Sequence, residues 1–450
     1  MFTLGEKTGG SPVNFMNYKP NTNKPNFISH KRQGFRQGPR QSANGMGQKY
    51  SGSTTPRAFK SYNSTNTPQQ RFQNRRPRKF IKEFNDPSVF VKKVQPVAII
   101  EEQIEHTSFD EFAFPNVLKD NIKSKGYTKP TPIQDKSIEA MLEGHDLIGI
   151  ANTGTGKTAA FLLPIITTLY KDRQKKAIVI APTRELAAQI HAEFRSFTKD
   201  IKLFSSLVIG GANMHRQIYE VRRGVHLVVG TPGRIKDLIE QKALFLEDYE
   251  IVVLDEVDLM VDIGFIQDVK YFISLMPQER QSLFFSATIT PKVSQILEQF
   301  VRNPITVSVK KQETSQNIDQ DVVRVNDPSK KLDQLHDLLI KEEFKKVLVF
   351  GRTKWGVEKL HKDLTTRGFR VGAIHGNKSQ GHRARVLDSF KRDQIQILLA
   401  TDVAARGLDI PHVSHVINYE LPESYEDYIH RIGRTGRASQ TGVALTFIEN

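Results

Sequence analysis

From about residue 106, short apolar runs alternate with amphipathic stretches along the chain. The apolar runs are DLIGI, AIVIAP, LVIGG, LVVGTP, IVVLDE and SLFFSAT, and each one ends in small or polar residues. Helix-like segments such as TRELAAQIHAEFRSF lie between them. An alternation of buried strands and amphipathic helices predicts a parallel sheet with helices on both faces.

The alternation pauses once and then resumes. Residues 309–321 read VKKQETSQNIDQD, a polar stretch suited to a linker. After it come VLVFGRT, RVGAIHG, IQILLATD, HVINYE and VALTFIEN. We therefore expect an α/β protein with two tandem domains at residues 94–308 and 318–450, joined by a linker at 309–317. Ligands of open α/β sheets bind at the carboxyl ends of strands, so the residues just after the apolar runs are the candidates for chemistry.

The first fifth of the chain shows neither helical nor strand periodicity. Residues 1–93 are rich in Asn, Gln, Ser, Gly and Pro, and they hold 18 Lys or Arg against 3 Asp or Glu. The remaining residues hold 47 against 46, so nearly all of the net charge of +16 lies in this segment. So little apolar surface cannot offset the entropy of ordering, which predicts a disordered basic tail. Cations interleaved with single aromatics suit single-stranded nucleic acid, and a plain linker is the alternative.

Composition narrows the class of protein. Cysteine is absent, which excludes disulfides, zinc–thiolate sites and thiol nucleophiles, and suits a reducing cytoplasm. No apolar run approaches the roughly 18 residues that span a bilayer. We therefore expect a cytoplasmic protein without a membrane segment. The thirteen histidines lack convergent ligands, so we expect surface and packing roles for them rather than metal sites.

The first candidate site is the loop in DLIGIANTGTGKTAAFLLPII. Gly154 and Gly156 let backbone N–H groups surround phosphate oxygens, and the following helix adds the positive end of its dipole. Lys157 reaches the β- and γ-phosphates, and Thr158 can hold Mg²⁺. The loop begins with Ala151 where the commonest version has glycine. These residues predict a nucleoside triphosphate site and, by themselves, no more than that.

The second candidate site is IVVLDEVDLM. Asp255 follows the apolar run, where a carboxylate can ligate Mg²⁺ directly or through water. Glu256 is placed to orient and deprotonate an attacking water, as hydrolysis requires. Asp258 adds a third carboxylate. A solvated acidic turn is the alternative, but it does not account for the position of this run in the same sheet pattern as the phosphate loop.

With these motifs, residues 106–450 resemble the DEAD-box family of RNA helicases in superfamily 2, with Val257 in place of the family's alanine (DEVD for DEAD). The resemblance rests on about a dozen motifs in the family's order. It implies two RecA-like domains that bind ATP and Mg²⁺, and RNA-stimulated hydrolysis coupled to local, non-processive unwinding of short duplexes. It also implies contacts to the sugar-phosphate backbone with little base specificity. We expect a monomer with ribonucleoprotein partners.

The resemblance also assigns roles within the nucleotide site. It implies an adenine-reading element at residues 109–134, in which Tyr127 stacks on the base and Gln134 bonds its edge. The residues expected to bind ATP are Phe109, Tyr127, Gln134, Ala151, Asn152, Thr153, Gly154, Thr155, Gly156, Lys157, Thr158 and Asp409. Those expected to hold the metal are Thr158 and Asp255. Those expected to couple ATP to RNA are Asp258, Ser286, Thr288 and His430.

The remaining motifs imply the RNA contacts. The residues are Pro182, Thr183, Arg184, Gly211, Thr231, Arg234, Arg352, Thr353, Gln380, Arg383 and Thr401. Trp355, the only tryptophan, follows one of these motifs, and we expect it to pack rather than to stack on RNA.

Near the end of the chain, YIHRIGRTGRAS places Arg431, Arg434 and Arg437 three residues apart, which suits an anion. The resemblance implies that Arg434 and Arg437 are arginine fingers that neutralise charge on the γ-phosphate. With Lys157 and Glu256, they form the expected catalytic set. An arginine-rich surface helix is the alternative, but interleaved glycines cost a helix about 1 kcal/mol each.

Three functions agree with these residues. The first is an RNA helicase that separates short duplexes. The second is an ATP-gated RNA clamp that scaffolds other proteins and unwinds little. The third is a DNA helicase of the same superfamily, which the adenine-reading element disfavours. Strand separation distinguishes the first from the second, and competition between DNA and RNA as ATPase activators tests the third.

Overall fold

The computed structural model describes residues 90–93, 104–152, 154–309, 317–405, 408, 410–436 and 441–449. Its strands form two parallel sheets, one in each predicted domain. The prediction of an α/β protein with two tandem domains is confirmed. Residues 1–89, which carry most of the predicted tail, lie outside the described residues.

The first domain is built on a seven-stranded parallel sheet with the order β3-β4-β2-β5-β6-β1-β7. Its strands are β1 (Leu147–Ile150), β2 (Ala177–Ile180), β3 (Ser205–Val208), β4 (Leu227–Gly230), β5 (Ile251–Leu254), β6 (Gln281–Ser286) and β7 (Ile305–Ser308). Its helices are α1 (Asn116–Ser124), α2 (Pro132–Leu142), α3 (Lys157–Lys171), α4 (Arg184–Phe197), α5 (Met214–Arg222), α6 (Pro232–Glu240), α7 (Val257–Ile263), α8 (Ile266–Ser274) and α9 (Pro291–Phe300). Short 3₁₀ turns lie at η2 (Phe109–Glu111) and η3 (Leu246–Asp248).

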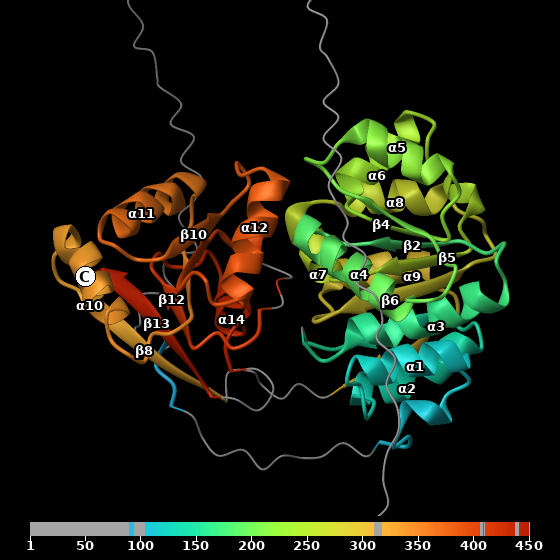
Figure 1. Ribbon diagram of the computed structural model, residues 1–450, viewed down its shortest axis with the longest axis horizontal. Helices are drawn as coiled ribbons and strands as arrows, with labels where there is room; N and C mark the ends of the chain where they lie inside the picture. Colours follow the sequence, from blue (N-terminus) through green and yellow to red (C-terminus); the bar gives the residue numbers. More distant parts are fainter. Residues whose placement is uncertain are drawn as a thin grey trace, which may run out of the picture. The chain divides into compact units, whose positions relative to one another are not determined.

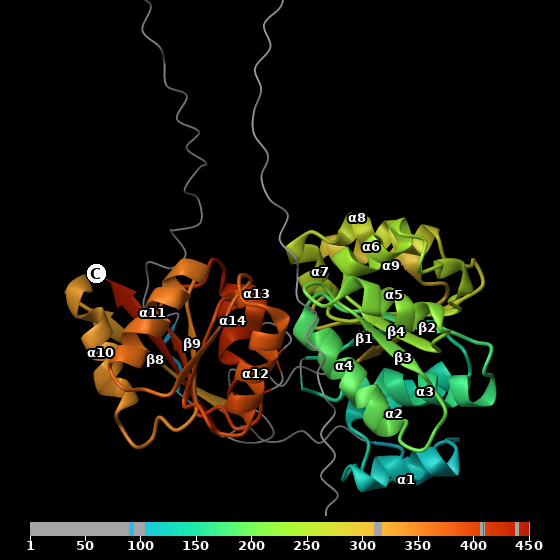
Figure 2. The same ribbon diagram turned by 45° about the horizontal axis from the view of Figure 1, so that its top comes forward.

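Successive side chains of each central strand point to opposite faces of this sheet. Val179 and Val253 pack with residues of α1 to α4, whereas Ile178 and Val252 pack with residues of α5 to α9. Figures 1 and 2 show α1 to α3 on one side of the sheet and α5, α6 and α8 on the other. Both faces are therefore covered, as a parallel sheet requires, and the carboxyl ends of the strands are left to carry the site.

The second domain is built on a six-stranded parallel sheet with the order β10-β11-β9-β12-β13-β8. Its strands are β8 (Ile318–Val325), β9 (Val347–Phe350), β10 (Val371–Ile374), β11 (Ile397–Ala400), β12 (His415–Asn418) and β13 (Gly442–Glu449). Its helices are α10 (Lys331–Leu339), α11 (Lys354–Thr366), α12 (Gln380–Lys391), α13 (Asp402–Ala405) and α14 (Tyr425–Ile432), with a 3₁₀ turn at η5 (Pro328–Lys330).

The same alternation builds the second core. Val349 and Leu399 pack with α10 and α11, and Leu348 and Leu398 pack with α12 and α13. Strand β8 lies at the edge of the sheet. Residues 90–93, which the sequence assigns to the tail, pair with β8 and so lie against the second domain.

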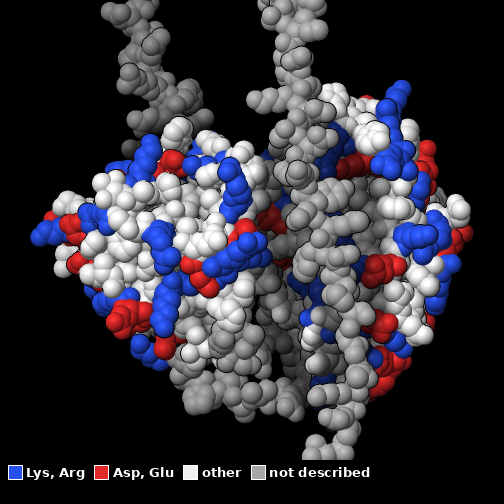
Figure 3. Space-filling view, in the orientation of Figure 1, with Lys and Arg blue, Asp and Glu red and all other residues white. Residues whose placement is uncertain are grey.

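The described surface carries charges of both signs, as the near-neutral composition of residues 94–450 predicts. On the face seen in Figure 3, the Lys and Arg side chains of the described residues are interspersed with Asp and Glu. Among the described residues, no helix has both the length and the apolar character that crossing a membrane requires.

Candidate active site

The loop after β1 adopts a backbone conformation that favours glycine. Gly154 has φ 86° and Gly156 has φ 95°, both in the left-handed region. A Cβ atom on Gly156 would lie 2.5 Å from Nε2 of Gln134 and 2.9 Å from Oγ1 of Thr131. Only glycine therefore lets the loop curl this closely against the start of α2.

Lys157 is the first residue of α3 and is buried. Its Nζ donates to the Ala151 carbonyl at 2.9 Å, which holds the charge inside the loop. The Thr155 hydroxyl donates to the Asn152 carbonyl at 2.8 Å and closes the turn. A buried ammonium group beside a glycine-containing loop at the start of α3 is the arrangement of a phosphate site. Thr153 lies outside the described residues.

Gln134 connects the adenine-reading element to the phosphate loop. Its Nε2 donates to the Gly156 carbonyl at 3.0 Å, and its Oε1 accepts from the Thr131 N–H at 2.8 Å. The side chain is almost completely buried. These hydrogen bonds join the start of α2 directly to the phosphate loop.

Tyr127 lies at the other side of the same site. Its hydroxyl donates to Oε1 of Glu193 at 3.0 Å. The rings of Phe109 and Phe197 meet its ring edge-on, at centroid distances of 6.1 and 5.6 Å. Phe109 is only 3% exposed. We therefore find Phe109 behind Tyr127, where it supports the tyrosine ring.

One of the acids after β5, Glu256, has a strained backbone. Glu256 has φ 51°, which is uncommon outside glycine and costs free energy. Its N–H donates to Oδ1 of Asp255 at 3.0 Å. Both residues are buried. Glu256 is the N-cap of α7, directly before the first helical residue.

Burial also sets the protonation of these acids. Burial raises the pKa of Glu256 to about 7, and the nearby Asp255 charge adds to this rise, while Lys157 and Arg434 oppose it. Burial likewise raises the pKa of Asp255, and Lys157 opposes that rise. A carboxyl group with a pKa near the working pH suits general-base catalysis, because it accepts a proton and is regenerated easily.

Asp258 joins this segment to the end of β6. Its Oδ2 accepts from the backbone N–H of Ala287 at 3.1 Å, from the N–H of Thr288 at 3.0 Å and from the Thr288 hydroxyl at 3.1 Å. The Ser286 hydroxyl donates to the Thr288 carbonyl at 2.8 Å. Three of the four residues expected to couple ATP to RNA are thus in direct contact.

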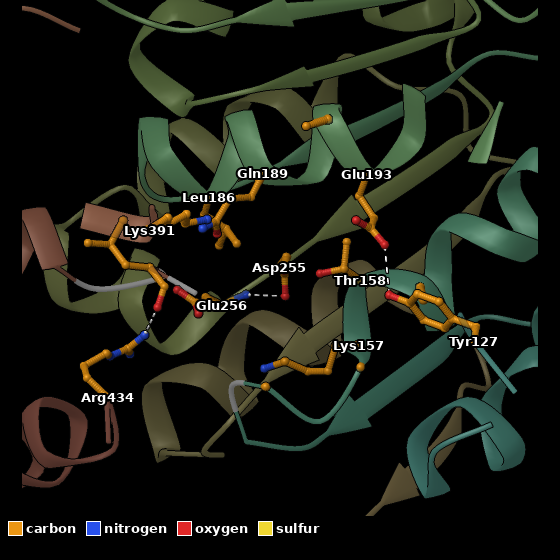
Figure 4. A pocket seen from close by; sticks show the side chains of 15 residues that line it. Tyr127, Lys157, Thr158, Leu186, Gln189, Glu193, Asp255, Glu256, Lys391 and Arg434 are labelled. Atoms are coloured by element: carbon orange, nitrogen blue, oxygen red, sulfur yellow. Dashed lines mark hydrogen bonds between the residues drawn. The ribbon is translucent and has the colours of Figure 1, made fainter. Parts of the chain in front are cut away.

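These side chains surround a cavity of about 440 Å³, within the range of ligand sites. Arg434 lines it too (Figure 4), donating to the Leu408 carbonyl at 2.7 Å and the His430 carbonyl at 3.2 Å. Asp409 and Arg437 lie outside the described residues. The lining residues are Tyr127, Gly154, Gly156, Lys157, Thr158, Ala159, Leu186, Gln189, Ala192, Glu193, Asp255, Glu256, Lys391, Leu408 and Arg434.

Thr158 and Asp255 both line this cavity. Their hydroxyl and carboxylate oxygens are the hard donors that Mg²⁺ prefers. Within the described residues, no group of three or more His, Cys, Asp or Glu could hold a metal. Mg²⁺ is usually bound through one or two protein oxygens, with waters and substrate phosphates as its other ligands.

Two family models match this chain. The DEAD/DEAH box helicase model matches residues 131–296, and the model of the helicase conserved C-terminal domain matches residues 330–439. The chain belongs to the DEAD-box family of ATP-dependent RNA helicases. The two matches fall on the two sheets, so the predicted RecA-like pair is the fold of this family.

Curated relatives agree with this assignment. The chain is 44% identical over 342 residues to "ATP-dependent RNA helicase CshA" of Limosilactobacillus reuteri, covering 76% of this chain and 69% of that protein. It is 45% identical over 344 residues to "DEAD-box ATP-dependent RNA helicase CshA" of Geobacillus kaustophilus, covering 76% and 73%.

Solved structures also match. S. cerevisiae Dbp5 bound to RNA and ADP BeF3 matches with a TM-score of 0.69 at 32% identity, covering 77% of this chain and 90% of that one. Mss116p bound to ssRNA and AMP-PNP matches with a TM-score of 0.68 at 29% identity, covering 76% and 74%.

In the helicase's first domain, the predicted RNA contacts gather at adjacent strand ends. A Cβ atom on Gly211 would lie 2.6 Å from Nη1 of Arg184, so the glycine makes room for this guanidinium. Arg234 donates to the Ala212 carbonyl at 3.2 Å and to Asp237 at 3.1 Å. Pro182 and Thr183 follow β2, and Thr231 follows β4. The three motifs therefore form one cluster.

In the second domain, the predicted contacts lie at two helix starts and one strand end. Thr353 is the N-cap of α11, and its hydroxyl accepts from the Gly356 N–H at 3.0 Å, next to the exposed Arg352. Gln380 and Arg383 lie on α12, and Thr401 follows β11. The structure therefore places these five residues after β9, in the first turn of α12 and after β11.

Arg383 has a protein partner that the sequence did not suggest. Its Nη2 lies 2.6 Å from Oε2 of Glu185, and both side chains are largely buried. Nε2 of Gln380 donates to the other oxygen of Glu185 at 3.3 Å. The positive charge of Arg383 is therefore balanced by a carboxylate in this structure.

Two expectations need correction. Arg431 is fully buried, and its guanidinium bonds both oxygens of Asp402, at 2.5 and 2.8 Å. Its anion is therefore a structural aspartate rather than a ligand. The prediction that Trp355 packs is wrong, because it is 73% exposed. It occupies an outward position of α11, whose inward positions are filled by Val357 and Leu360.

The sequence reasoning missed Gln189 and Glu193, which line the cavity from α4. The two residues are four apart and therefore share one face of the helix. A search for polar residues at helical spacing after the PTREL motif could have found them.

Proposed function

We propose that this helicase uses one ATP per cycle to separate a short RNA duplex locally. The observation that carries the proposal is the common cavity of Lys157, Glu256 and Arg434. A phosphate-binding lysine, a base and a transition-state cation around one cavity are the parts that phosphoryl transfer to water needs.

The chemistry follows from these side chains. A water held by Glu256 attacks the γ-phosphorus, the bond to the β–γ bridging oxygen breaks, and ADP and inorganic phosphate leave. Glu256 accepts the proton from the water. Lys157 and Arg434 offset the negative charge that accumulates on the transferred group. Thr158 and Asp255 would hold Mg²⁺, which would supply positive charge to offset the charge of the phosphates.

The link to RNA is proposed to run through Asp258. This residue bonds to Ala287 and Thr288, so a shift near the γ-phosphate moves the end of β6. The cluster of Arg184, Gly211 and Arg234 is proposed to bind the sugar-phosphate backbone. Such contacts fix a strand in place without reading its sequence, so we expect little base preference.

The wider setting is also a proposal. We infer a monomer that works in the reducing cytoplasm, as the lack of cysteine suggests, together with ribonucleoprotein partners. The basic tail is proposed to add RNA affinity that does not depend on ATP.

The direct test is strand separation of a labelled short RNA duplex, followed alongside ATP hydrolysis. We expect separation with ATP and none for Lys157→Ala. ATP-dependent binding that persists for many minutes without separation would instead support the clamp. Equal stimulation of ATPase activity by DNA of the same sequence would indicate a DNA helicase.

A further inference from the structure

Residues 90–93, here called the anchor segment, precede the first domain in sequence but are bound to the second. The Lys92 N–H donates to the Gln320 carbonyl at 3.1 Å, and the Gln320 N–H donates to the Lys92 carbonyl at 2.8 Å. This is an antiparallel bridge to the edge strand β8. Figure 1 shows the segment as the short blue stretch beside β8.

Phe90 is inserted into the core of the second domain. It is 0% exposed and packs with Ile318, Tyr428, Ile432 and Ala444. Its ring meets the Tyr428 ring edge-on at 4.9 Å, a favoured geometry for an aromatic pair. A phenylalanine that is this completely buried belongs to the core and is more than a loose surface contact.

The contacts of Phe90 lead to α14. Tyr428 and Ile432 are residues of this helix, and the Tyr428 hydroxyl donates to Oε1 of Gln320 at 3.0 Å. The same glutamine pairs with the anchor segment through its backbone. The anchor segment therefore holds α14 both by packing and through the Gln320 side chain.

A second set of contacts that holds α14 comes from its residue Arg431, whose guanidinium is hydrogen-bonded to Asp402. Arg434 follows the helix directly, and its Nε donates to the His430 carbonyl in the last turn. The position of Arg434 in the cavity therefore depends on how α14 is held from both sides.

The outer edge of β8 in the second sheet can pair with one further segment. In the first domain, β7 pairs with the outer side of β1. The second sheet ends at β8 and has no such strand within the described residues. An uncovered edge strand exposes backbone donors and acceptors that another segment can pair with. The anchor segment pairs with this edge at Gln320.

We propose that the anchor segment is a positioning element for hydrolysis. Phe90 docks on the second domain, fixes α14 and thereby sets the position of Arg434. Because Lys93 and Ile104 lie on different domains, the chain between them is also a second covalent connection beside the linker at residues 309–317. The effect on hydrolysis rests on the proposed role of Arg434, whereas the docking does not.

Docking can be tested by a disulfide, because the native chain has no cysteine. Continuing the antiparallel register of Lys92 and Gln320 by one residue pairs Val91 with Asp321. Residues opposite each other in an antiparallel pair have Cα atoms about 4.5 to 5.5 Å apart, a separation that a disulfide allows. We expect Val91→Cys/Asp321→Cys to form an intramolecular disulfide under mild oxidation. Adding Phe90→Ala should slow its formation about tenfold.

The matched control is Val91→Cys/Asp388→Cys. Asp388 is an exposed acid on α12, which packs beside β10 at the other end of the sheet. Equal rates in the two pairs, or no effect of Phe90→Ala, would overturn the docking.

Positioning is tested by steady-state RNA-stimulated ATPase of the full chain. We expect Phe90→Ala to lower kcat about tenfold with the KM for ATP within about twofold, and Phe90→Leu to recover most of the rate. Ile340→Ala, which removes a 61% exposed apolar side chain of the same domain, should match the parent. An unchanged kcat in Phe90→Ala, or no recovery in Phe90→Leu, would overturn the positioning role.

The two proposals fail separately. If Arg434→Ala keeps its activity, the assigned role of Arg434 is wrong, and the disulfide rates still decide the docking. If Arg434→Ala is inactive while the disulfide pairs behave alike, the anchor alone is wrong.

Discussion

The two sheets of this helicase share a strand order and differ in the segments that their first strands lead into. Taken from one end, β3-β4-β2-β5-β6-β1 corresponds to β10-β11-β9-β12-β13-β8. Strand β1 leads into the phosphate loop, whereas β8 leads into residues 326–330. Topology alone would therefore allow a nucleotide site in either domain.

Local chemistry at the two strand ends decides between them. In the first domain, Gly154 and Gly156 open the backbone around Lys157. In the second, the Asp327 carboxylate accepts from the Ser329 N–H at 2.9 Å and from its hydroxyl at 2.7 Å. The Ser329 bonds hold the pKa of Asp327 below its usual range. A carboxylate thus stands where the first domain would bind phosphate.

The lysines that begin the two helices show the same contrast. Lys157 opens α3 and lines the cavity. Lys331 opens α10, but its Nζ lies 2.7 Å from Oε1 of Glu449 and 4.6 Å from the centre of the Tyr419 ring. Equivalent positions in a fold can therefore carry the same residue type for different purposes.

The largest expected effect is that of Lys157→Ala, with Lys331→Ala as its matched control. Lys157→Ala should abolish measurable ATP turnover, because the β- and γ-phosphates lose their cation. Lys331→Ala loses a partly exposed ion pair worth about 1 kcal/mol or less, so its turnover should stay within about twofold. Comparable losses in an ATPase assay would mean that the two strand ends are not distinct.

Arg434 and Arg431 belong to one motif, but we expect a catalytic role for the first and a structural role for the second. Arg434→Ala should lower kcat by about a thousandfold while nucleotide affinity changes only a few-fold, as removal of an arginine finger does. Arg431→Ala should instead destabilise the fold by about 3 kcal/mol, because Asp402 loses its buried partner. Thermal melting and nucleotide titration of both variants separate the effects. Parallel losses of binding and rate in Arg434→Ala would contradict a transition-state role.

Glu256→Gln should lower turnover by about a hundredfold, within the range of general-base contributions. The pKa of Glu256 is raised to about 7, so the group is protonated and inactive below this pH. The parent's kcat/KM should therefore rise with pH through about 7, and the variant should lack that rise. Glu420→Gln, at the equivalent strand end of the second domain, should keep it. An unchanged pH profile in Glu256→Gln would reassign the base.

Much of this site was predictable because its parts are local. The phosphate loop and the acids after β5 each follow from a short contiguous pattern, and the two-domain fold follows from the regular alternation of such local elements. Two of the missed contacts depend on partners distant in sequence. Phe90 lies in a segment without periodicity, and its pocket is built more than two hundred residues later. Arg383 likewise pairs with a distant carboxylate, that of Glu185, which lies in the first domain.

The smallest expected effect concerns the tail. Residues 1–86 hold 16 Lys or Arg against 3 Asp or Glu. A chain beginning at residue 87 keeps the anchor segment and removes most of this charge. If four cations of the tail engage RNA, its loss should flatten the log–log salt dependence of binding by about 3, with kcat at saturating RNA unchanged. Identical slopes in a salt titration would favour the plain linker.

The contrast between the two sheets is tested most directly by counting how many nucleotides bind to each chain. Calorimetric titration of the full chain with a non-hydrolysable ATP analogue, with RNA and Mg²⁺ present, should give one site per chain. Lys157→Ala should remove that site, and Lys331→Ala should leave it intact. Two sites per chain, or a site that survives in Lys157→Ala and is lost in Lys331→Ala, would contradict the account.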